Sequence, residues 1–172
     1  MSKKATSKKA KKREPVDPLA DSNLFKALEE GHRPQCRPGL QALESNHKSQ
    51  LRIPEGRFVA SIDVDKAMKE AEPNSNRWDY LVEYLNKVFA IEVHPSTEGE
   101  AKLIEKKAEW IRAWISKQPS LKKVVHTPKL AVCYWISSGK TALSPLAPKA
   151  KALATKKIII CGSIWDFNKY VD

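Results

Sequence analysis

Three acidic residues and a histidine stand in one short stretch with the pattern of a β-hairpin. The stretch covers residues 77–95, RWDYLVEYLNKVFAIEVHP. Because successive side chains of a strand point to opposite faces, Asp79 lies on one face of the first arm, and Glu92 and His94 share one face of the second. If residues 85–86 form a two-residue loop, or if the loop has any even length, the two faces coincide and Asp79 lies opposite Glu92.

Two opposed carboxylates would repel each other unless a cation lay between them. Mg²⁺ accepts a few carboxylate oxygens, keeps several water molecules and allows one of them to ionise and attack a phosphodiester. We therefore interpret Asp79 and Glu92 as a candidate Mg²⁺ site, with His94 as the side chain that positions the attacking water. The alternative is an ordinary amphipathic hairpin whose acids are solvated.

Other elements must position this hairpin. Residues 58–65, FVASIDVD, alternate between apolar and polar side chains and predict a strand, followed by a short helix with Asp65 as its N-cap. Asp63 and Asp65 could instead join the acidic cluster. After the hairpin, Thr97 and Glu100 have the spacing of a capping box, and the helix that follows has one apolar stripe. The stripe consists of Ala101, Ile104, Ala108, Ile111 and Ile115.

The rest of the chain completes an α/β pattern. Residues 129–137 are mostly apolar and predict a strand covered on both faces, followed by a helix over 148–155 and a last strand over 157–161. The element order is β-α-β-β-α-β-α-β, which indicates a single mixed β-sheet with flanking helices. We predict one α/β domain over residues 50–172.

Positive charge is concentrated at the N-terminus. The formal net charge is +11, and residues 1–13 hold seven cations and no acid. These cations are Lys3, Lys4, Lys8, Lys9, Lys11, Lys12 and Arg13. A tail of this composition is expected to be disordered, and it either contacts nucleic-acid phosphates without reading sequence or only solubilises the chain. Residues 14–49, punctuated by proline, are expected to form a loosely ordered lead-in.

The hairpin and the elements after it resemble the PD-(D/E)XK nuclease superfamily, which has the restriction-endonuclease-like fold. Members place an aspartate and an ExK pair on a similar hairpin. The resemblance covers roughly residues 58–137. It implies a restriction-endonuclease-like core, with Asp79 and Glu92 as metal ligands and the Val93 carbonyl as a candidate third ligand.

The sequence departs from this family at two motif positions. His94 stands where the family has lysine, and Trp78 stands where it has proline. Lys102 or Lys106, on the next helix, is a candidate for a relocated cation, and we include Lys102 among the predicted catalytic residues. The expected function is a Mg²⁺-dependent nuclease, or an inactive relative, acting on DNA or RNA. The alternatives are a nucleic-acid-binding module that uses the basic tail, and a protein-interaction domain.

The cysteines, a glycine-containing loop and the hydropathy of the chain say less about function than the hairpin does. Cys36, Cys133 and Cys161 are far apart and form no CxxC pair, which favours buried free thiols in a reducing cytosol. Residues 137–141, SSGKT, resemble a phosphate-binding loop, but Tyr134 occupies the position of its first glycine. No apolar run approaches the length of a membrane span, so a soluble, cytoplasmic protein is expected.

Overall fold

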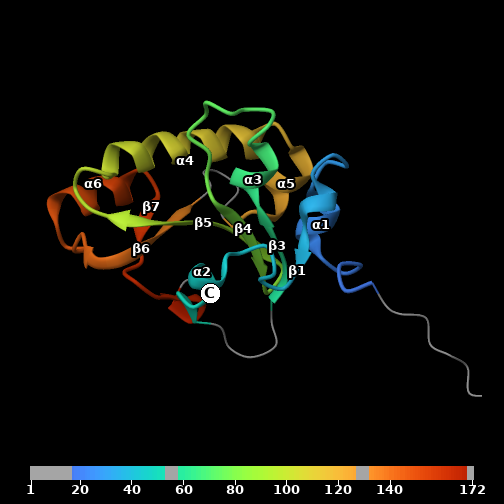
Figure 1. Cartoon of the computed structure of the whole chain (residues 1–172), viewed down its shortest axis with the longest axis horizontal. Helices are drawn as coiled ribbons and strands as arrows, with labels where there is room; N and C mark the ends of the chain where they lie inside the picture. The colour runs from blue at the N-terminus through green and yellow to red at the C-terminus, as the bar shows by residue number, and fades with distance from the viewer. Residues whose placement is uncertain (1–16, 53–57, 127–131, 170–172) are drawn as a thin grey trace, which may run out of the picture.

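The computed structural model describes residues 17–52, 58–126 and 132–169, and its centre is a mixed six-stranded sheet (Figure 1). The strand order is β1-β3-β4-β5-β6-β7. The first three pairings are antiparallel, whereas β5–β6 and β6–β7 are parallel. The predicted α/β class with one mixed sheet is therefore confirmed. The strands are β1 (Arg37–Pro38), β3 (Phe58–Asp63), β4 (Tyr80–Tyr84), β5 (Lys87–Ser96), β6 (Cys133–Ala142) and β7 (Ile158–Ile160).

In the part of the chain that the structure describes, five helices cover one face of the sheet. Their buried side chains share one apolar cluster with inward residues of β3, β4, β5, β6 and β7. The connection from β5 to its parallel neighbour β6 passes through α4 and α5 and packs on this face (Figure 1). The helices are α1 (Asn23–Ala27), α3 (Val64–Met68), α4 (Ala101–Ser116), α5 (Pro119–Val124) and α6 (Pro148–Thr155).

The opposite face carries most of the aromatic side chains of the hairpin. This face is covered by Leu43 and by a small parallel sheet of β2 (Leu51–Arg52) and β8 (Trp165–Asp166). In the chain, α2 (Ser45–Lys48) precedes β2, and the 3₁₀ helix η2 (Phe167–Lys169) follows β8. Both faces of the hairpin are therefore buried. The alternative of a hairpin whose acids are solvated is therefore wrong for Glu83 and Glu92, which the helical layer covers.

The hairpin has the predicted register. Leu85 and Asn86 form a two-residue turn with φ of 46° and 64°, as a type I′ turn requires, and Glu83 pairs with Val88. Tyr80 pairs with Ile91, so residues 79 and 92 follow as the next facing positions. Asp79 and Glu92 consequently lie on one face, as expected from the period of two.

The long helix α4 has the predicted apolar stripe, but it begins differently from the expectation. All five stripe residues are buried, because that side packs on the sheet. The N-cap is Glu100 with helical backbone angles and no side-chain capping bond, so the predicted capping box from Thr97 is wrong. The Glu100 carboxylate is bound to His94 instead.

Two further segments differ from the sequence-based expectations. The N-cap of α3 is Asp63, whose Oδ1 accepts from the Lys66 N–H at 2.8 Å, and not Asp65. The region expected to be a loosely ordered lead-in supplies α1 and β1, and it contributes Leu24 and Leu28 to the main core. The basic tail over residues 1–13 lies outside the described residues.

Candidate active site

Asp79 and Glu92 are held by reciprocal hydrogen bonds across the hairpin. The Asp79 N–H donates to Glu92 Oε2 at 3.0 Å, and the Val93 N–H donates to Asp79 Oδ2 at 3.0 Å. The Asp79 carbonyl also accepts from the N–H of Val64 at the start of α3 at 2.8 Å. One oxygen of each carboxylate is therefore fixed by backbone, and the second oxygen of each is left to bind something else.

The second carboxylate oxygen of Asp79 and that of Glu92 contact the same ammonium group. Lys107 Nζ bonds Glu92 Oε1 and lies 3.4 Å from Asp79 Oδ1. The side chain descends from α4, which crosses over this part of the sheet. We call Asp79, Glu92 and Lys107 the carboxylate–lysine cluster.

Sequence reasoning placed the helical cation at Lys102 or Lys106 and missed Lys107. A signal for Lys107 was present, because it lies three residues after Ile104 and four before Ile111, on the flank of the apolar stripe. A lysine at this position points toward the sheet and needs a buried anion. Lys102 and Lys106 are exposed.

The cluster is enclosed at one end and open at the other. The Glu92 side chain has no exposed surface, whereas Lys107 and Asp79 retain 14% and 19% of theirs. A ligand that enters from solvent therefore meets Asp79 and the ammonium group first. Glu92 forms the floor, between the sheet and α4.

The cluster contains more negative than positive charge when all three groups are ionised. Burial raises the pKa of Glu92, and the Asp79 charge raises it further, while Lys107 opposes both. Burial by itself lowers the pKa of Lys107, but the charges of Glu92 and Asp79 outweigh burial and raise it. One ammonium therefore serves two carboxylates, and the raised pKa of Glu92 shows that Lys107 alone does not offset burial and the Asp79 charge.

His94 lies on the same strand two residues after Glu92, but its ring is directed to the start of α4. Its Nε2 lies 2.9 Å from Glu100 Oε2, and its carbonyl accepts from Trp135 Nε1 at 3.0 Å. Of the predicted catalytic residues, the structure brings together Asp79 and Glu92 and adds Lys107. It binds His94 to Glu100, and it leaves Lys102 in solvent.

The third acid of the hairpin, Glu83, has a different role. It lies on the same face as Asp79 but at the other end of β4, under the start of α1. Its carboxylate accepts from Ser22 Oγ at 2.6 Å and from the backbone N–H groups of Asn23 and Leu24 at 2.9 Å each. Glu83 therefore anchors the N-terminus of α1 and is not part of the cluster.

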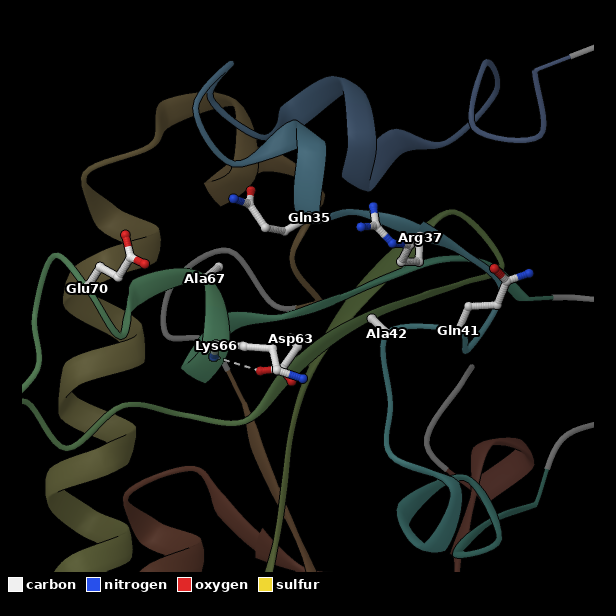
Figure 2. A pocket seen from close by; sticks show the side chains of 8 residues that line it. All are labelled: Gln35, Arg37, Gln41, Ala42, Asp63, Lys66, Ala67 and Glu70. Carbon is white, nitrogen blue, oxygen red and sulfur yellow. Dashed lines mark hydrogen bonds between the residues drawn. The ribbon is translucent and has the colours of Figure 1, made fainter.

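A polar cavity of about 360 Å³ lies at the end of β3 (Figure 2). One of its lining residues, Asp63, pairs with Tyr80, the residue after Asp79, and its pKa is raised mainly by burial and also by the Asp65 and Asp79 charges. Segments around β1, the end of β3 and α3 surround the cavity, and two cations and two acids line it. The lining residues are Gln35, Arg37, Gln41, Ala42, Asp63, Lys66, Ala67 and Glu70.

The donor set fits a hard divalent cation. Two carboxylate oxygens already converge on one positive charge, and carboxylate oxygens are the ligands that Mg²⁺ prefers. Mg²⁺ commonly takes one or two carboxylates and completes its shell with water and phosphate oxygens. In the part of the chain that the structure describes, no group of three or more His, Cys, Asp or Glu side chains is placed to hold a metal, so the fit rests on this pair.

Comparisons with known proteins identify no matching family model, no matching curated protein and no matching solved structure. Among the described residues, no helix has both the length and the apolar character needed to cross a membrane.

Proposed function

We propose that the carboxylate–lysine cluster is the active site of a Mg²⁺-dependent nuclease that hydrolyses phosphodiester bonds in nucleic acid. The observation that carries the proposal is the convergence of Asp79 Oδ1 and Glu92 Oε1 on a single cation position. Backbone hydrogen bonds hold the two carboxylates there, although their charges repel each other. A protein gains little stability from such an arrangement, whereas a metal site requires it.

The order of elements around the cluster supports a restriction-endonuclease-like core. The antiparallel strands β3, β4 and β5 are followed by the crossover helix α4 and by β6, which is parallel to β5. Asp79 immediately precedes the second of these strands, and Glu92 lies within the third. This agrees with the hairpin, helix and strand on which the PD-(D/E)XK resemblance was based.

Each residue of the cluster has a defined task in this proposal. Asp79 and Glu92 would hold the Mg²⁺, and the ion would supply an ionised water as the nucleophile. Lys107 supplies the positive charge that the superfamily takes from the ExK lysine, whose position is occupied here by His94. In the metal-bound state the Lys107 ammonium would leave the carboxylates and face a phosphate at the open end of the cluster, where its side chain keeps its small exposed surface.

A non-catalytic nucleic-acid-binding protein of the same fold is the second candidate. The complete burial of Glu92 favours it, because a lysine that neutralises a buried acid also serves as a fixed structural ion pair. In that case the ammonium permanently occupies the cation position. The two candidates differ in whether a metal can replace it.

Isothermal titration of the full chain with Mg²⁺ and Mn²⁺ distinguishes them. The nuclease proposal expects saturable binding that is lost in Glu92→Gln and retained in Glu109→Gln, an exposed acid of the same helix layer. Near-ultraviolet circular dichroism shows whether each variant keeps its tertiary packing. A folded wild-type chain that binds neither metal would refute the nuclease and leave the binding protein.

A further inference from the structure

The charge of the body is divided unevenly along the chain. Residues 14–97 contain ten Lys and Arg against fourteen Asp and Glu, whereas residues 98–172 contain fourteen against six. The second part supplies α4, α5, α6 and the strands that follow β5. The part of the chain that carries the hairpin is therefore acidic on balance, and the part that carries α4, α5 and α6 is basic.

Two helices of the basic part form a common surface. Arg112 of α4 donates from Nη2 to the carbonyls of Lys156 and Lys157, just after α6, at 2.7 and 3.1 Å. Lys156 Nζ in turn lies 2.7 Å from Glu105 Oε2 of α4. These contacts hold α6 against the flank of α4 (Figure 1).

Four lysines of this surface are exposed, and none of them takes part in an ion pair within the described chain. Lys102 and Lys106 lie about one turn apart on α4. Lys149 and Lys151 lie on α6, a helix without a single acid, one on each side of the buried Ala150. We call these four residues the α4–α6 basic face.

The basic face and the carboxylate–lysine cluster share one helix. Lys106 and Lys107 are neighbours in sequence and differ by about 100° around the helix axis. Lys107 therefore points to Asp79 and Glu92 while Lys106 points to solvent.

We propose that the α4–α6 basic face binds the phosphate backbone of a nucleic-acid duplex. A duplex presents one negative charge per about 1.7 Å of its length, which complements unpaired lysines spread over two adjacent helices. The exposed positions of α4 and α6 carry no aromatic side chain, and proteins that bind single strands use aromatic side chains to stack bases. The inference rests on the proposed function only where it identifies the bound duplex as the substrate.

The test is a binding titration of the full chain with a fluorescein-labelled DNA duplex in EDTA, at a series of NaCl concentrations. The variant changes Lys102, Lys106, Lys149 and Lys151 to Gln. The matched control changes four other exposed lysines outside α4 and α6, which are Lys26, Lys69, Lys122 and Lys123. A third protein has the seven cations of residues 1–13 changed to Gln.

The proposal expects at least tenfold weaker binding for the basic-face variant and less than a threefold change for the control. The slope of log K against log [NaCl] should become shallower by about 0.9 for each lost phosphate contact, or by about 3.6 for all four. Equal losses in the variant and the control, or a loss confined to the tail variant, would overturn the proposal. So would loss of binding to phosphatidylserine vesicles in the basic-face variant without any loss of DNA binding.

The same proteins separate this inference from the nuclease proposal. If the basic-face variant loses duplex binding while the wild-type chain binds no metal, the surface stands and the nuclease fails. If the wild-type chain cleaves DNA and the basic-face variant still binds the duplex with unchanged affinity, the surface fails and the nuclease stands.

Discussion

Replacing Lys107 by Met tests whether the two carboxylates depend on the cation between them. The substitution keeps most of the side-chain volume and removes the ammonium that contacts Glu92 and Asp79. Removing one partner of a buried ion pair typically costs about 3–5 kcal/mol, because the remaining charge is left without compensation. The small exposure of Lys107, 14%, places this cluster close to the buried case.

The expected loss is large against the stability of a whole domain, which is about 5–15 kcal/mol. For a chain of this size, each kcal/mol lowers the Tm by about 2–4 °C, so Lys107→Met should lower it by about 6–20 °C in EDTA. Urea unfolding followed by circular dichroism gives the same quantity as a free energy. Mn²⁺ should restore about 2.7 kcal/mol when its concentration is a hundred times the Kd, since it takes the position that the ammonium vacates.

The double variant Lys107→Met/Glu92→Gln is the control for this prediction. It leaves a single carboxylate, Asp79, which keeps partial contact with water. We expect it to be more stable than Lys107→Met and to show no Mn²⁺ effect. The reasoning would be refuted if Lys107→Met unfolded at the wild-type urea concentration, or if Mn²⁺ stabilised the single and the double variant equally.

Three further predictions concern parts of the fold away from the cluster. Ser22→Ala should lower the free energy of unfolding by about 1–3 kcal/mol, as measured by urea unfolding. The substitution removes the N-cap of α1 and leaves one hydrogen-bonding site of the buried Glu83 unpaired. A loss below a few tenths of a kcal/mol would contradict this reasoning. Leu85→Gly should stabilise the chain by about 0.5–1 kcal/mol in the same assay, because Leu85 is exposed and has a φ of 46°, which favours glycine. A destabilised variant would show that the Leu85 side chain contributes packing. Burial raises the pKa of Cys36 to about 11 and that of Cys133 to about 12. Neither thiol should therefore react with iodoacetamide at pH 8 until urea is added. Rapid labelling of either cysteine in the native protein, detected by mass spectrometry, would refute their burial.

The hairpin was predictable because its signals are local. Alternation of side chains fixes which residues share a face, and a two-residue loop fixes the register between the arms. The relation of Asp79 to Glu92 follows from these two facts alone. The stripe of α4 was predictable for the same reason, since it depends only on the helical period.

The surroundings of the acids were not predictable, because they depend on contacts between distant segments. Glu83 anchors a helix that begins sixty residues earlier, at Asn23. The burial of Glu92 depends on where α4 crosses the sheet, and the choice of Lys107 over Lys102 or Lys106 depends on the rotation of that helix about its axis. A lysine on the flank of an apolar stripe was the only local sign of this pairing.

The most direct test of the central claim is cleavage of labelled DNA and RNA, single-stranded and duplex, by the full chain with Mg²⁺ or Mn²⁺. The account predicts hydrolysis that stops in EDTA, is abolished in Asp79→Asn and Glu92→Gln, and persists in Glu109→Gln. Cleavage that survives both active-site substitutions, or no cleavage of any of these nucleic acids by the folded wild-type chain with either metal, would contradict it.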